Sequence, residues 1–119
     1  MKILLATNGS EWSEVAVQEV AERMWPAGSI VRIVSVVGPS FVCNHPFAPI
    51  ALDISGEIER SLTDAADAAV KHARSELTRN GDAALRVETR VLVGPPGPAI
   101  RDEAEGWGAD LVVVGSHVR

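Results

Sequence analysis

The sequence predicts an α/β fold of the flavodoxin or Rossmann type, in which an open parallel sheet carries helices on both faces. The first observation is two short apolar runs, residues 3–6 and Leu111–Val114, each of which leads directly into a small polar loop. Unbroken apolar runs of this length are typical of strands buried on both faces of a parallel sheet. The second observation is that β-branched and helix-periodic segments alternate between these runs, which favours parallel pairing through right-handed crossovers. We therefore predict the element order β-α-β-α-β-α-β within one domain, residues 1–119.

The composition limits both the architecture and the partners. A chain of 119 residues with 46% hydrophobic content can bury the core of a single domain. The net charge of −5, without a run of like charges, argues against a nucleic acid or an anionic membrane as partner. No apolar run approaches the roughly 18 residues that a membrane span requires. The single cysteine, Cys43, excludes an internal disulfide and predicts a cytoplasmic location.

The first half of the chain shows clear signals for a strand, a helix and a second strand. After the strand at residues 3–6, Gly9 permits a tight turn, and Ser10 is the expected N-cap of a helix that runs to about Trp25. The second strand is expected at residues 29–37, which are rich in β-branched side chains. The core face expected of the helix consists of Val17, Val20, Ala21 and Met24.

The second half begins with a segment that lacks any period. Residues 38–56 contain three prolines and are expected to form a long loop, followed by a helix at residues 57–79. The strand expected at residues 85–93 is polar on one side, which places it near a sheet edge. Pro98 suits the first turn of a further helix, and Gly108 is expected to end it before the last strand.

The candidate site lies where the first and last strands end. Thr7 and Asn8 follow the first strand, and Gly115, Ser116 and His117 follow the last. In an open α/β sheet the ligand binds beyond the carboxyl ends of the strands, so neighbouring strands would bring these loops into one crevice. Asn8 could equally hydrogen-bond its own turn, and Gly115 could serve only as the exit from the strand.

The sequence also resembles a known family at both ends. KILLATNGS at residues 2–10 and ADLVVVGSH at residues 109–117 are similar to the universal stress protein family. The resemblance implies the strand order 3-2-1-4, normally followed by a fifth strand and a final helix. It also implies a regulatory or protective protein that is usually a dimer, and some members of the family bind ATP or AMP.

The resemblance has consequences for the crevice. Nucleotide-binding members carry an aspartate at the position of Asn8, and a Gly-x2-Gly-x9-Gly-Ser/Thr pattern whose first glycine matches Gly115 and whose second falls on Val118. Both departures predict weak or absent nucleotide binding, because asparagine grips ribose less well and valine keeps the backbone from phosphate. Pro96 and Ile100 also match the family pattern. The nucleotide-binding residues implied, with the adenine towards Val36, are Ala6, Thr7, Asn8, Val36, Val114, Gly115, Ser116 and His117.

Other functions have weaker support in the sequence. Cys43 and His45, with Asp53 nearby, fall short of a tetrahedral metal site, so we expect no bound metal. We also assign no catalytic residue. A nucleotide hydrolase or ATP-dependent enzyme of the related adenine-nucleotide α-hydrolase group would need a glycine-rich loop after the first strand, where only Gly9 is present. A third alternative is a structural dimer module with an empty crevice.

The last strand, Leu111–Val114, suggests a protein partner. It is apolar on both faces, and without the family's fifth strand it would form an edge that nothing but its short length protects. We therefore expect a homo-oligomer, most simply a dimer, in which a partner covers this edge. The alternative is that the 119 residues are a fragment of a longer protein.

Overall fold

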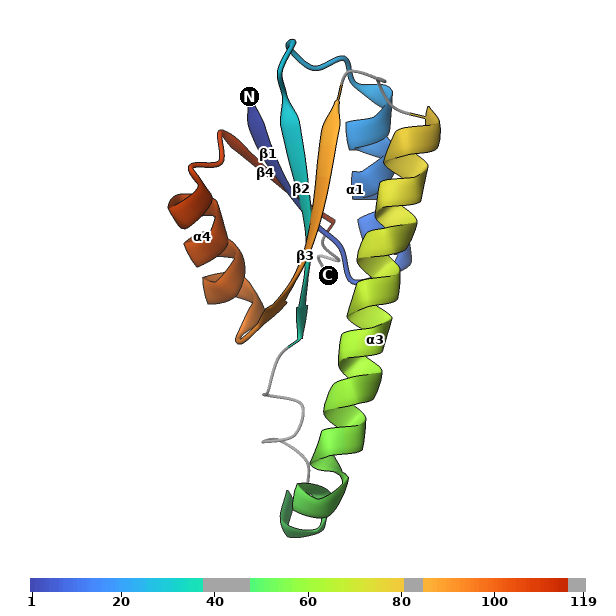
Figure 1. Ribbon diagram of the computed structural model, residues 1–119, viewed down its shortest axis with the longest axis vertical. Coiled ribbons are helices and arrows are strands. Elements are labelled where there is room, and N and C mark those ends of the chain that lie inside the picture. The colour runs from blue at the N-terminus through green and yellow to red at the C-terminus, as the bar shows by residue number, and fades with distance from the viewer. Residues whose placement is uncertain (38–47, 81–84, 116–119) are drawn as a thin grey trace.

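The computed structural model describes residues 1–37, 48–80 and 85–115, although the side chains of residues 48–60 and of residue 80 are not described. Figure 1 shows strands and helices alternating along the chain. The elements are β1 (Lys2–Ala6), α1 (Glu11–Glu22), β2 (Ile30–Val37), α3 (Ala48–Asn80), β3 (Arg86–Val93), α4 (Pro96–Trp107) and β4 (Leu111–Val114). Within these residues, no helix combines the length and apolar character needed to cross a bilayer.

The four strands form one parallel sheet in the order β3-β2-β1-β4. α1 and α3 lie together against one face of this sheet, and α4 lies against the other (Figure 1). The predicted fold class, strand order and placement of helices on both faces are therefore confirmed. All four strands point the same way, so their carboxyl ends meet at one edge of the sheet.

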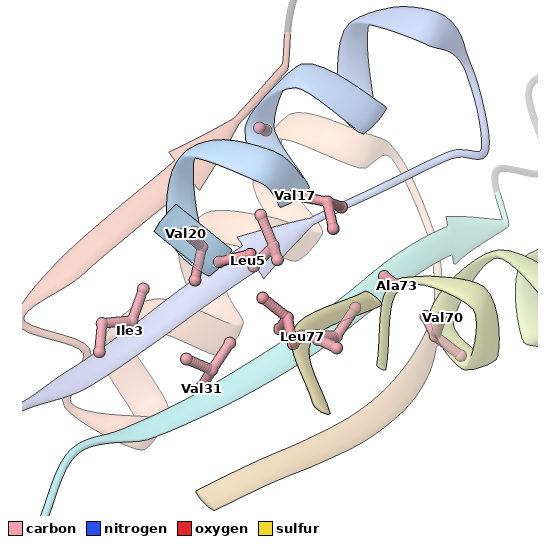
Figure 2. Close-up of a cluster of buried hydrophobic side chains, with 11 residues drawn as sticks. Ile3, Leu5, Val17, Val20, Val31, Val70, Ala73 and Leu77 are labelled. Carbon is pink, nitrogen blue, oxygen red and sulfur yellow. The ribbon is translucent and has the colours of Figure 1, made fainter. Parts of the chain in front are cut away.

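The apolar core lies between the sheet and the helix pair α1 and α3. Alternate residues of β1 and β2 point into it, because successive side chains of a strand face opposite sides. Figure 2 shows these strand residues meeting apolar side chains of both helices. The labelled members of this cluster are Ile3, Leu5, Val17, Val20, Val31, Val70, Ala73 and Leu77, all of which are buried.

The first helix begins as predicted and ends earlier than predicted. The Ser10 hydroxyl accepts a hydrogen bond from the Ser13 backbone N–H at 3.3 Å, which confirms the N-cap. The helix stops at Glu22, and the Trp25 indole N–H donates to the Val20 carbonyl at 2.9 Å, which satisfies an unpaired group of the last turn. The expectation that Met24 faces the core is wrong, because beyond the helix end its side chain is 94% exposed.

The helix α3 begins at Ala48, so the loop predicted for residues 38–56 is wrong from residue 48 onward. Pro49 falls in the first turn, where a missing backbone N–H breaks no helical bond, and a single interior glycine, Gly56, costs only about 1 kcal/mol relative to alanine. Residues 38–47 lie outside the described part of the chain. The buried residues of α3 are Ala66, Ala69, Val70, Ala73 and Leu77.

The two edge strands, β3 and β4, are only partly covered. β3 lies at one edge, as its polar side predicted. β4 lies at the other edge, where Leu111 and Val113 pack against the core cluster. Val112 and Val114 are 42% and 49% exposed, so the expected burial of this strand on both faces is wrong. The reason is that α4, the helix on that face, packs mainly against β2.

Candidate functional site

A cavity of about 260 Å³ lies at the carboxyl ends of β1, β2 and β4, on the face of the sheet that α4 covers. The crevice was predicted at this place from the loops that follow the first and last strands. Six of the predicted residues line the cavity, namely Ala6, Thr7, Asn8, Val36, Val114 and Gly115. Ser116 and His117 lie outside the described residues.

Four further residues line the cavity and were not assigned to the site beforehand. Pro96 and Ile100 come from α4, and both had matched the family pattern. Val34 lies two residues before Val36 on β2, so strand alternation places both on the same face of the sheet. Ser13 lies in the first turn of α1, three residues after the N-cap Ser10, and its burial beside the cavity is evident only in the folded structure.

The walls of the cavity are mostly aliphatic. Val34 and Val36 of β2, Val114 of β4 and Ile100 of α4 present apolar groups from three different elements. The polar groups come from Thr7 and Asn8 in the loop between β1 and α1 and from Ser13 in the first turn of α1. Apolar walls with a few polar groups are typical of small-molecule sites, whose volumes are roughly 300–1,000 Å³. The cavity is slightly smaller than this range and suits a small ligand or part of a larger one.

Asn8 organises the loop between β1 and α1. Its side-chain oxygen accepts hydrogen bonds from the Ser10 backbone N–H at 2.9 Å and from the Ser13 hydroxyl at 3.1 Å. The Asn8 backbone N–H lies 3.4 Å from the Ser13 hydroxyl oxygen, and the Gly9 N–H donates to the Thr7 hydroxyl at 3.3 Å. Asn8 therefore does hydrogen-bond its own turn, as one interpretation of the sequence held.

Only the oxygen of the Asn8 carboxamide takes part in the turn. Asn8 is exposed, and its side-chain nitrogen forms no hydrogen bond with any residue in the described part of the chain. An amide nitrogen donates two hydrogen bonds and accepts none. Asn8 can thus offer a donor to a ligand in the cavity while its oxygen holds the turn, so the two interpretations of this residue are compatible.

The close approach of the α1 backbone explains why position 115 is a glycine. A β-carbon at this position would lie 1.9 Å from the Trp12 carbonyl oxygen and 2.7 Å from the Ser13 α-carbon. Contacts this short are sterically forbidden, so the exit from β4 can pass the first turn of α1 only with glycine. Gly9, in the facing loop, adopts a φ of 80°, which also favours glycine. Gly115 therefore lets the end of β4 lie against the start of α1 at the cavity.

The described lining of the cavity is uncharged. None of the described residues that line the cavity is ionisable. Within the described chain, no three histidine, cysteine or acidic side chains gather where they could hold a metal ion. Cys43, His45 and Asp53, the weak metal candidates, have no described side chains. The described lining therefore supplies apolar contacts and neutral hydrogen-bonding groups.

A larger cavity of about 420 Å³ lies on the opposite face of the sheet, between α1 and β4. Its floor is apolar, with Val20, Trp25, Leu111 and Val113. It lies away from the carboxyl ends of the central strands, and its polar groups belong to Glu19 and Arg23, which pair with each other at 3.6 Å. The smaller cavity is the better ligand site because polar groups from an organised loop converge on it.

The pattern of the Universal stress protein family matches residues 1–119, which is the whole chain. The chain belongs to the universal stress protein family. This confirms the resemblance seen at residues 2–10 and 109–117. Universal stress protein MJ0577 of Methanocaldococcus jannaschii is similar to it, with 25% identity over 98% of this chain and 76% of that protein.

Solved structures of universal stress proteins share the fold of this family member. The structure of MJ0577 has a TM-score of 0.76 at 25% identity and covers 93% of this chain and 71% of that one. UspA from Lactobacillus plantarum has a TM-score of 0.73 at 18% identity, over 96% of this chain and 75% of that one. A universal stress protein in complex with cAMP has a TM-score of 0.61 at 21% identity, over 94% of this chain and 69% of that one.

Proposed function

We propose that this universal stress protein binds an adenine nucleotide, ATP or AMP, weakly in the cavity at the carboxyl ends of β1, β2 and β4. The observation that carries the proposal is the cavity itself, where aliphatic walls face the hydroxyl and amide groups of one loop. Aliphatic side chains suit the faces of a base, and the loop groups suit the ribose hydroxyls. A universal stress protein of the same fold in complex with cAMP supports this ligand class.

Calorimetric titration with AMP and ATP tests the proposal. The variant Ile100→Trp places a larger side chain in the cavity wall and should abolish the heat of binding. Arg101→Trp is the matched control, because Arg101 is exposed on the same helix and does not line the cavity. Equal binding by the wild type and Ile100→Trp would show that any nucleotide site lies elsewhere.

We propose regulation or protection through binding, and catalysis is the second candidate. General acid and base catalysis requires a titratable group within reach of the reacting atoms, and the described lining contains none. Phosphate release from ATP by the purified protein should therefore stay at the rate of buffer alone. Release that disappears in Ile100→Trp would instead favour a hydrolase of the adenine-nucleotide α-hydrolase group.

We also propose that a second copy of this chain pairs with β4. This strand lies at a sheet edge of the described structure, and Val112 and Val114 are exposed along it. Leu111–Val114 contains no lysine, proline or bulge of the kind that blunts natural edges. A two-fold axis perpendicular to the sheet would pair β4 with its own copy in the antiparallel direction, which satisfies the same unpaired backbone groups in both chains.

A further inference from the structure

The helix α4, which forms one wall of the cavity, has no fully buried residue. A helix that covers a sheet is usually fixed by a buried apolar stripe. The inward side of α4 is only half-buried and consists of Ala99, Ile100, Glu103, Ala104 and Trp107. Some other contact must therefore set the position of this helix on the sheet.

Glu103 provides a polar contact of this kind. Its carboxylate accepts a hydrogen bond from Arg32 of β2 at 2.8 Å and from Arg90 of β3 at 2.8 Å, with a second Arg90 contact at 3.2 Å. The Glu103 side chain is only 10% exposed, and that of Arg32 is 19% exposed, so solvent ions screen their attraction less than at the open surface. One carboxylate thus joins the helix to two neighbouring strands.

The Arg32 guanidinium also contacts residues other than Glu103. Its Nε donates to Glu88 of β3 at 3.1 Å, and its guanidinium carbon lies 4.3 Å from the ring centroid of Trp107. The Lys2 ammonium group donates to the Trp107 carbonyl at 3.0 Å. A planar guanidinium that is held by the Glu88 carboxylate and the Trp107 ring presents its remaining donors to Glu103 in one orientation.

This charged cluster lies next to the cavity on the same face of the sheet. Arg32, Val34 and Val36 alternate along β2, and the last two line the cavity. On the helix, Ile100 precedes Glu103 by one turn and Pro96 precedes Ile100 by another, so all three share one side. A rotation of α4 about Glu103 would therefore move the cavity wall.

We propose that Glu103 is a positioning residue for the cavity, because its bonds to Arg32 and Arg90 hold α4 in the rotation that makes Pro96 and Ile100 a wall. A separate hydrogen bond fixes the turn before α4 to the end of β2, because the Gly94 N–H donates to the Val37 carbonyl at 2.9 Å. The role for the ligand rests on the proposed nucleotide function, while the role for the wall does not depend on it.

The test compares Glu103→Gln with the matched control Glu105→Gln. Glu105 is exposed on the same helix and forms no ion pair with any described residue. Amide hydrogen exchange of residues 100–107 in ligand-free protein should be about tenfold faster in Glu103→Gln, as expected on loss of one charge-assisted bond, with β1 unchanged. The AMP dissociation constant should rise by a similar factor, and Glu105→Gln should match the wild type in both measurements.

The two measurements separate the outcomes. Unchanged exchange in Glu103→Gln, or the same change in both variants, overturns the positioning role. Faster exchange in β1 as well as α4 also overturns it, because it indicates general destabilisation. If α4 loosens while AMP affinity stays at the wild-type value, Glu103 anchors the helix without shaping the site, and the inference fails. If the wild type binds no AMP, the proposed function fails, and the exchange measurement alone decides whether Glu103 fixes the wall.

Discussion

Gly115 and Trp12, more than a hundred positions apart, approach so closely that a β-carbon on Gly115 would lie 1.9 Å from the Trp12 carbonyl oxygen. The contact joins the exit from β4 to the first turn of α1. It places the end of β4 beside the start of α1, and Gly115 and Ser13 both line the cavity at the carboxyl ends of the strands.

Gly115→Ala should destabilise the protein because the added methyl group has no room. We expect the free energy of unfolding to fall by about 1–3 kcal/mol, as in other overpacked sites. Urea unfolding followed by circular dichroism measures this value. Gly106→Ala is the control, because a β-carbon there meets nothing within 4 Å and the helical position should gain up to about 1 kcal/mol. A stable Gly115→Ala variant would show that β4 can move away from α1.

Asn8→Asp should improve nucleotide binding. One carboxylate oxygen can keep the bonds to the Ser10 N–H and the Ser13 hydroxyl, and the second oxygen adds an acceptor for a ribose hydroxyl. We expect the AMP dissociation constant to fall by about tenfold, the effect of one charge-assisted bond, in calorimetric titration. Submicromolar binding by the wild type, or no gain in Asn8→Asp, would contradict this view of the ribose contact.

Val112→Lys should favour the monomer if β4 pairs with a second copy. A charged side chain on an edge strand opposes the approach of another strand. Sedimentation velocity should show the wild type as a dimer and Val112→Lys as a monomer. Val93→Lys is the matched control, since Val93 is 75% exposed on β3 at the opposite edge. A monomeric wild type, or dissociation only in Val93→Lys, would exclude β4 as the interface.

Glu76 should make the stability depend on pH. The hydrogen bond from Arg79 lowers the pKa of Glu76 below its usual value, and Gln18 of α1 donates to the same carboxylate at 3.2 Å. Because the folded pKa lies below the unfolded one, the contribution is present above the unfolded pKa and is lost as the pH falls through the folded pKa.

Unfolding experiments between about pH 6 and about pH 3 measure this contribution. Glu76→Gln should show a shallower decline in the free energy of unfolding than the wild type. Arg79→Gln should also flatten the curve, because it removes the main cause of the lowered pKa. Identical slopes in all three proteins would mean that Glu76 ionises alike in both states.

Residue patterns predicted the strands, the helices and the crevice between the first and last strands, while the strand order and the place of Val36 in the site came from the family resemblance. The strands and the two junctions where a strand leads into a polar loop are local sequence patterns. Parallel pairing then places both junctions at the edge of the sheet where the strands end. The helix boundaries near Trp25 and within residues 38–56 differ from the prediction, because a proline in the sequence does not by itself fix where a helix ends or begins. Pro49 instead occupies a first helical turn, where proline is well tolerated.

The remaining features depend on contacts between distant segments. Glu103 meets Arg90 across 13 positions and Arg32 across 71, and no short motif connects such residues. The tight fit of Gly115 against α1 likewise follows only from the folded backbone. Asn8 was ambiguous in the sequence, because an asparagine can hold a turn or contact a ligand, and only the folded geometry shows that its side-chain oxygen holds the turn.

The central place of β1 affects the order in which the chain can fold. Ile3 pairs with Val31 on one side and with Leu111 on the other. During synthesis, the first strand can join β2 early, but its second neighbour, β4, is made after all the other elements of the sheet. Until then one edge of β1, an interior strand, stays open, and contacts of such high sequence separation form slowly. We therefore expect the nascent chain to need protection from aggregation until Leu111–Val114 has been made.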